Sequence, residues 1–207
     1  MDGEGNAFLR AKANQKLKVT KLLLAAWAFI YMDATRLKAY IGLTCKAGGF
    51  NEVLKKLLHQ QLIDPRDIFL LFGPVDILIR FANIQNLEEF IEKYFNPVRL
   101  IGAEENLIIK TLSFIVAKEG PSLAESPYAF VFLNVQPKNL ESVHRTLLSF
   151  PEVISVDTVF GPYDIICSVK AVDQMDLLCT VTKIQEVPGV ENSVTSIVSP
   201  IPLFPEW

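Results

Sequence analysis

Apolar runs in the C-terminal half of the chain predict four strands, over residues 129–135, 153–160, 163–169 and 190–198. Two amphipathic segments lie between them, one beginning at Asn139 and one at Asp173, and both residue types favour a helix N-terminus. Gly161-Pro162 turns the chain between the second and third strands, and Pro188-Gly189 ends the second helix. The predicted order is therefore βαββαβ. The helical residues expected to face inward are Leu140, Val143, Leu147, Leu148, Leu177, Leu178, Val181 and Ile184.

The N-terminal half repeats this pattern. Residues 39–45 align with 129–135, and Phe72-Gly-Pro-Val-Asp-Ile77 aligns with Phe160-Gly-Pro-Tyr-Asp-Ile165 with five identities in six positions. Residues 112–116 align with 194–198, so the first copy carries about six extra residues before its last strand. Helices are expected over 51–61 and 87–95, the second with Asn86 and Glu89 as a capping box. The chain is interpreted as two copies of one unit of about 75 residues.

This element order predicts an α+β fold made of two ferredoxin-like units. Strand residues such as Phe130, Val131 and Phe132 are apolar at both even and odd positions, whereas a strand with one face in water should alternate apolar with polar residues. The second sheet face is therefore expected to be buried as well. Two solutions are open: the sheets pack on each other as an internal pseudo-dimer of the dimeric α/β-barrel type, or each packs on a neighbouring chain.

The predicted domain boundaries are a lead-in over 1–36, a first domain over 37–117, a linker over 118–126, a second domain over 127–200 and a Pro-rich tail over 201–207. The lead-in holds basic residues followed by an apolar run from Leu22 to Met32, which is too short for the roughly 18 to 20 residues of a membrane span. It is interpreted either as an N-terminal helix that docks on the body or as a segment upstream of a start at Met32. No membrane association is expected, and the predicted location is the cytoplasm.

Composition narrows the function classes. The chain of 207 residues is 50% hydrophobic and carries a net charge of −3, which excludes a disordered or disulfide-scaffold protein and argues against a nucleic-acid-backbone binder. The three cysteines are expected to be reduced core residues, and the two widely separated histidines predict no metal site. Nucleotide-binding glycine motifs and nucleophile elbows do not occur in the sequence, so an enzyme is not expected and no cofactor is predicted.

The second copy resembles the effector-binding (RAM, ACT-like) domain of the leucine-responsive regulatory protein (Lrp)/AsnC family. The resemblance lies in residues 129–135, the Phe160–Ile165 turn, and Val187-Pro-Gly-Val190 followed by Thr195-Ser-Ile-Val198; it is good over 127–199 and weaker over 38–117. It implies a ferredoxin-like domain that dimerises sheet to sheet, assembles further and binds small effectors, typically amino acids, near the Gly-x-x-Asp turn. Full-length members carry a helix-turn-helix domain of about 50 to 60 residues, for which the roughly 37 residues before this unit leave too little room.

The resemblance implies an effector site at Gly161, Tyr163 and Asp164, with Gly73 and Asp76 at the equivalent positions of the first copy. The glycine would let the backbone approach a ligand or adopt a positive φ, and the carboxylate would receive an ammonium group. The alternative is a hairpin turn that the aspartate caps. Val75 stands where the second copy has Tyr163, which makes a site in the first copy more doubtful.

The predicted function is a tandem effector-sensing module that binds a small metabolite, an amino acid by the resemblance, without a DNA-binding domain of its own. Its expected partners are that effector and either further copies of itself or full-length Lrp/AsnC-type regulators. Two alternatives stay open: a structural or oligomerisation module with vestigial pockets, and a small ferredoxin-like enzyme.

Overall fold

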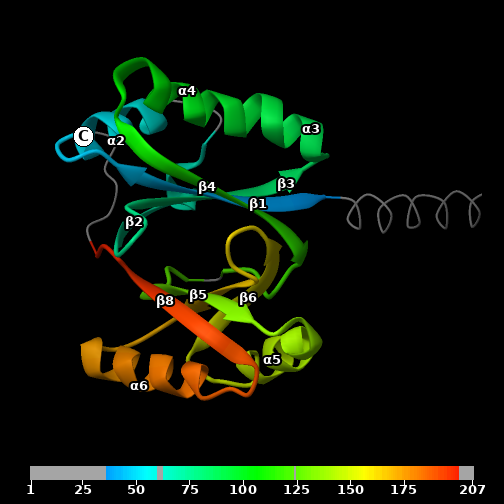
Figure 1. The fold of residues 1–207 in the computed structure, drawn as a ribbon. Helices are drawn as coiled ribbons and strands as arrows, with labels where there is room; N and C mark the ends of the chain where they lie inside the picture. Colours follow the sequence, from blue (N-terminus) through cyan, green and yellow to red (C-terminus); the bar gives the residue numbers. More distant parts are fainter. Residues whose placement is uncertain (1–35, 60–62, 124, 201–207) are drawn as a thin grey trace, which may run out of the picture. The chain divides into compact units, whose positions relative to one another are not determined.

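A computed structural model describes residues 36–59, 63–123 and 125–200 (Figure 1). The described residues from Leu37 onward belong to one compact unit. The predicted N-terminal helix and the Pro-rich tail over 201–207 lie outside the described residues, as does the apolar run from Leu22 to Met32. Within the described segments, the helices are too short or too polar to cross a bilayer.

Eight antiparallel strands form a closed barrel in the order β1-β3-β2-β8-β5-β7-β6-β4. The strands are β1 (Leu37–Cys45), β2 (Ile68–Phe72), β3 (Ile77–Ile84), β4 (Ile108–Lys118), β5 (Ala129–Val135), β6 (Val153–Phe160), β7 (Ile165–Val169) and β8 (Val190–Val198). The α+β class and the antiparallel sheet agree with the prediction. Closure depends on two short ladders between the halves, Leu71–Phe72 with Ile197–Val198 and Ile115–Lys118 with Thr158–Phe160. The sheets therefore also pair edge to edge, which the expectation of face-to-face packing did not include.

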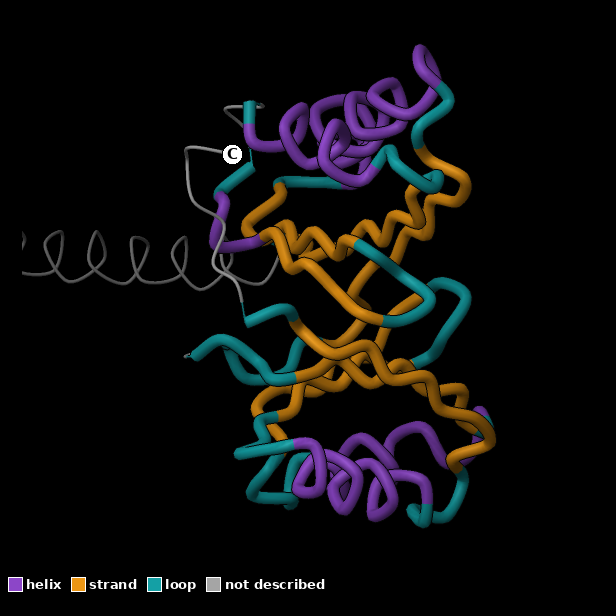
Figure 2. Tube along the Cα trace, turned by 90° about the vertical axis from the view of Figure 1, so that its left-hand side faces the viewer, coloured by secondary structure: helices purple, strands orange, loops and turns teal. Residues whose placement is uncertain are grey.

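The helices lie outside the barrel, one set beside the strands of each half (Figure 2). They are α2 (Phe50–Leu58), α3 (Leu87–Glu89), which continues through a π-helical segment (Phe90–Phe95) into α4 (Asn96–Glu105), α5 (Leu140–Leu147) and α6 (Gln174–Gln185). Short 3₁₀ turns precede β2 (Pro65–Asp67) and α5 (Pro137–Asn139). Each half thus has the strand and helix order expected for it.

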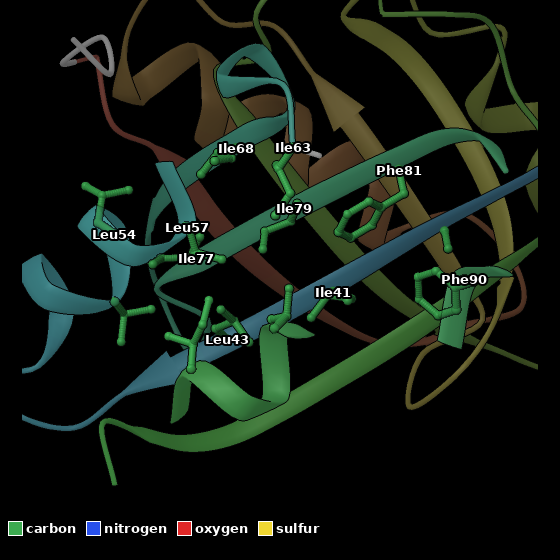
Figure 3. Packing of buried hydrophobic residues seen from close by; sticks show 14 of the residues in the cluster. Ile41, Leu43, Leu54, Leu57, Ile63, Ile68, Ile77, Ile79, Phe81 and Phe90 are labelled. Atoms are coloured by element: carbon green, nitrogen blue, oxygen red, sulfur yellow. The ribbon is translucent and has the colours of Figure 1, made fainter. Parts of the chain in front are cut away.

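Three apolar clusters fill the spaces between these layers. One packs the first-half helices on β1, β2 and β3, with Ile41, Ile77 and Ile79 among its members (Figure 3). A second packs α5 and α6 on the second-half strands, and the third occupies the barrel interior, where Tyr40, Phe114 and Phe130 belong to it. Successive residues of β1 and β5 alternate between a helix-facing cluster and the interior cluster, so both strand faces are buried, as their sequences predict.

The two halves share their ladder registers. Ala39 pairs with Phe81 and Ile115, while Ala129 pairs with Val169 and Ile197. These partners are related by the offsets of 90, 88 and 82 residues at which the two sequence segments align. Equivalent residues of the two halves therefore occupy equivalent places in their sheets.

The helix after β3 is longer than the predicted 87–95 and absorbs the extra residues of the first half. Pro97 cannot donate a backbone hydrogen bond, and its ring disfavours a regular helical turn before it. The chain takes the wider π-helical turn over 90–95, in which the Asn96 N–H bonds to the Ile91 carbonyl, and then continues to Glu105. The first half therefore has a helix extension where Pro188-Gly189 ends the helix of the second half.

Some local predictions hold and others are wrong. Asn86 and Asp173 cap their helices by accepting from the Glu89 and Asp176 N–H groups, at 2.8 and 2.9 Å. Asn139 makes no such cap. The residues predicted to be buried that are exposed are Leu148, Leu178 and Cys179. Leu148 follows the last residue of α5, and Leu178 and Cys179 lie on the solvent-facing side of α6, away from its buried residues Leu177, Thr180 and Ile184.

Candidate functional site

The predicted site residues of the second half lie on the hairpin between β6 and β7. The Asp164 N–H donates to the Leu133 carbonyl at 2.8 Å, and the Asp164 carbonyl accepts from the Val159 N–H at 2.9 Å. Its carboxylate Oδ2 accepts the N–H of Val135 at 2.8 Å. Asp164 therefore joins its own hairpin to the end of β5, and one carboxylate oxygen is committed to that joint.

Asp76 makes the same three bonds on the hairpin between β2 and β3. Its N–H donates to Leu43, its carbonyl accepts from Leu71, and its Oδ2 accepts the N–H of Cys45 at 2.7 Å. The turn carbonyls are also held alike, because Thr44 donates to Pro74 at 3.0 Å and Asn134 donates to Pro162 at 3.2 Å. Burial, and secondarily the charge of Asp76, raises the pKa of the Cys45 thiol to about 11.

The two turn glycines allow close packing on a strand of the other half. A Cβ at Gly161 would lie 2.9 Å from the Ser113 carbonyl oxygen on β4, and one at Gly73 would lie 2.5 Å from the Ser196 Oγ on β8. Their φ angles are outside the positive range, which in the described residues glycine adopts at Gly48 and Gly189. The close approach at both turns is to protein, which is a physical reason for glycine that needs no ligand.

Tyr163 is half-buried at the junction of the two halves. Its ring stacks 6.4 Å from Phe114 of β4 and lies 5.4 Å from Phe132 of β5, measured between centroids. In the first half Val75 packs against Gly42, so two small residues fill the place of Tyr163 and Phe132. The exposed Phe160, at 71%, adds an aromatic surface beside the second-half turn.

The structure thus brings Gly161, Tyr163 and Asp164 together on one hairpin, and Gly73 and Asp76 on another. The second-half hairpin offers an exposed ring, a half-exposed phenol and a carboxylate. The first-half hairpin offers the exposed Phe72 and the carboxylate but buries Val75. The chemical means to hold an aromatic or cationic small molecule are therefore richer in the second half.

A buried charge cluster in the barrel interior was missed by sequence reasoning. Asp157 of β6, 1% exposed, accepts from Lys38 Nζ at 2.8 Å and from the Tyr40 hydroxyl at 2.5 Å, both on β1. Its Oδ1 accepts the Gly120 N–H at 2.9 Å, and Lys38 lies 3.5 Å from the Glu119 carboxylate. Burial raises the pKa of Tyr40 well above its usual value, and the charge of Asp157 adds to this. The sequence feature that could have revealed this cluster is the single aspartate within the largely apolar strand 153–160.

A second charged pair lies at a cavity beside β2. Arg80 donates from Nε to Asp67 Oδ1 at 2.7 Å, its Nη2 lies 2.6 Å from the same oxygen, and its guanidinium lies 5.8 Å from the Phe69 ring centroid. The cavity measures about 630 Å³. Its lining residues are Asp64, Pro65, Arg66, Asp67, Ile68, Phe69, Leu70, Arg80, Leu123, Glu125, Ser126, Val198 and Ser199.

Groups of three or more His, Cys, Asp or Glu side chains able to hold a metal ion do not occur among the described residues. The two described histidines have different surroundings. The His59 ring contacts its own helix, while His144 is buried with its Nε2 atom 3.2 Å from the Val156 carbonyl oxygen. Burial lowers the pKa of His144.

Comparison with known proteins identifies the second half. Residues 128–202 match the family model described as the Lrp/AsnC ligand binding domain, which confirms the resemblance over this part of the chain. The HTH-type transcriptional regulator FL11 of Pyrococcus horikoshii is 28% identical over 100 residues, which cover 48% of this chain and 65% of that protein. FL11 of Pyrococcus abyssi is 27% identical over the same shares. The chain therefore spans just under two thirds of the curated relatives it matches.

Among solved structures, the siroheme decarboxylase NirDL is similar over a longer stretch. It has a TM-score of 0.59 and 10% identity, covering 79% of this chain and 71% of that one. At this identity the likeness extends the shared fold beyond the second half and says nothing of activity.

Proposed function

We propose that the chain is a tandem effector-sensing module of the Lrp/AsnC type that binds a small metabolite at the second-half hairpin. The observation that carries the proposal is the match of residues 128–202 to the ligand-binding domain of that family. The same segment contains Phe160, Tyr163 and Asp164, which place aromatic surface and a carboxylate on one turn. An amino acid suits these groups, since its ammonium would meet Asp164 and its side chain the rings.

The shared registers of the two halves support the tandem part of the proposal. Asp76 and Asp164 make equivalent bonds, and Thr44 and Asn134 hold equivalent turns. The first half then supplies the surface that a second protomer would supply to a single-copy domain, because β4 packs against the Gly161 turn. We favour a regulatory function, exerted through association with Lrp/AsnC-type regulators, over a catalytic one.

The test is a thermal-shift screen of the whole protein against the twenty amino acids, with Asp164→Asn as the probe variant. Asparagine keeps an oxygen that can accept the Val135 N–H but removes the charge that would hold an ammonium group. We expect at least one amino acid to raise the melting temperature of the wild type and to lose that effect in Asp164→Asn. Asp76→Asn is the matched control, since it makes the same change on the first-half hairpin and should keep the response.

Two outcomes would count against sensing at this hairpin. A flat response of the wild type to all twenty amino acids would remove the amino-acid effector. A ligand response that Asp164→Asn and Tyr163→Val both retain would move the site elsewhere. Tyr163→Val introduces the residue that the first half has at the equivalent position, Val75, so valine is compatible with this type of hairpin.

An assembly module is the second candidate, and the hairpin geometry favours it specifically. Each aspartate commits an oxygen to a strand end, and each glycine packs on protein, so turn structure alone explains both residue types. The exposed Phe72 and Phe160 would then be contact points for further copies. Light scattering distinguishes this candidate: oligomers that dissociate in Phe72→Ser/Phe160→Ser, without any amino-acid response, would support assembly.

A further inference from the structure

The cavity beside β2 contains charged side chains that barrel formation does not require. Asp67 and Arg80 lie side by side just beyond the Ile68–Ile79 ladder pair. The equivalent positions of the second half, 88 residues later, are Ser155 and Ser168, which pair with each other on β6 and β7. The same place in the same fold is therefore filled by two small neutral residues in one half and by an ion pair in the other.

An ion pair gives little net stability at such a place. Arg80 and Asp67 are 20% and 25% exposed, and pairs of this kind repay their desolvation and side-chain ordering only in part. The second-half serines are almost completely buried, so the space can be closed by small residues. The charged pair and the cavity of about 630 Å³ beside it occur together on the first-half side.

Arg80 is fixed beside this cavity by contacts to an acidic and an aromatic side chain. Asp67 engages its Nε and Nη2 atoms, and Phe69 lies 5.8 Å from the guanidinium carbon. A guanidinium has five N–H donors, so it can bind a second carboxylate while it keeps the first. Phe69, Leu123 and Val198 supply apolar wall to the same cavity.

We propose that this cavity is a second small-molecule site, which binds a carboxylate-bearing metabolite with an apolar or aromatic body. The carboxylate bonds to Arg80, and the body lies against Phe69, Leu123 and Val198. The cavity shares no lining residue with the Gly161–Asp164 hairpin, so the two sites can be tested by separate substitutions.

The experiment compares three probes that share a phenyl group: 3-phenylpropanoate carries only a carboxylate, L-phenylalanine carries both charges, and phenethylamine carries only an ammonium group. Isothermal titration calorimetry of the wild-type protein should detect 3-phenylpropanoate and L-phenylalanine, whereas any binding of phenethylamine should belong to the Asp164 hairpin and disappear in Asp164→Asn. The double variant Asp67→Ser/Arg80→Ser copies the second half and should weaken 3-phenylpropanoate at least about tenfold, because it removes the charge-assisted bonds. Arg80→Lys keeps the cation but loses the planar fork, and should also bind more weakly.

Circular dichroism and urea unfolding show whether Asp67→Ser/Arg80→Ser and Arg80→Lys are folded. If the double variant does not fold, Arg80→Lys alone still tests the proposal. Asp164→Asn should bind 3-phenylpropanoate like the wild type, which distinguishes this cavity from the hairpin. The proposal is overturned if 3-phenylpropanoate does not bind, if the folded Arg80 variants bind it unchanged, or if only the amine binds. A change in 3-phenylpropanoate binding in Asp164→Asn, with the Arg80 variants unchanged, would assign the acid to the hairpin, so the effector proposal would stand without this one.

Discussion

Replacing Asp157 by alanine should be among the most destabilising single changes in the chain. The carboxylate is buried and receives three donors, from Lys38, Tyr40 and the Gly120 backbone. Its removal leaves the Lys38 ammonium, 5% exposed, with the more distant and exposed Glu119 as its remaining acidic neighbour in the described cluster. Breaking one side of a buried ion pair costs about 3 to 5 kcal/mol. We expect a loss of free energy of unfolding of that size.

The assay is equilibrium urea unfolding followed by circular dichroism at neutral pH. The control is the pair Lys38→Met and Lys38→Met/Asp157→Leu. Replacing both charges by apolar residues of similar volume removes the unpaired ion, so the double variant should recover most of the loss. With Asp157→Leu as the second single variant, a double-mutant cycle then gives a coupling free energy of roughly 2 kcal/mol or more between Lys38 and Asp157.

The reasoning would be refuted if Asp157→Ala lost less than about 1 kcal/mol, a value typical of exposed pairs. It would also be refuted if the single and double variants were equally destabilised, since Asp157 would then act through shape and not through its charge.

Three further predictions concern residues outside the barrel strands. Gly120→Ala should destabilise by roughly 1 to 3 kcal/mol in urea unfolding, because its Cβ would lie 2.3 Å from the Val156 carbonyl oxygen; unchanged stability would contradict the contact. Burial lowers the pKa of His144 in the folded protein, so below the ordinary histidine pKa of about 6.5 the unfolded chain binds more protons than the folded one. The free energy of unfolding should therefore fall as the pH drops through that value. The variant His144→Gln should show a flatter pH dependence, and parallel curves for the two proteins would disprove the link. Maleimide should label the exposed Cys179 rapidly in the native protein and Cys167 only after unfolding; Cys179→Ser should abolish the fast phase, and a fast phase that persists would contradict the assigned exposure.

The repeating apolar pattern was sufficient to predict the element order and the burial of both strand faces. Residues of β1 and β5 are apolar at both parities because one face meets helices and the other meets the opposite sheet. A barrel of two packed units was expected, but the strand edges that close it were not predicted, since closure depends on a few backbone pairs such as Leu71 with Val198. Backbone bonds of that kind leave no mark in the side-chain pattern.

The hairpin residues were found through their resemblance and repetition, but their contacts were not. Asp164 bonds to Val135 and Gly161 packs on Ser113, both of which lie on strands distant in sequence. The barrel-interior charges were missed for a related reason. Lys38, Asp157 and Arg80 are single polar residues in or beside apolar runs, and their partners are determined by how the strands cross.

The most direct test of the proposed amino-acid sensing is the melting temperature of the wild-type protein with each of the twenty amino acids. At a hundredfold excess over the dissociation constant, a ligand adds about 2.7 kcal/mol of stability. For a chain of this size, that free energy corresponds to a rise of roughly 5 to 11 °C, which the account predicts for at least one amino acid and which Asp164→Asn should abolish. No rise with any of them at millimolar concentration would contradict the account and leave assembly as the better explanation of the fold.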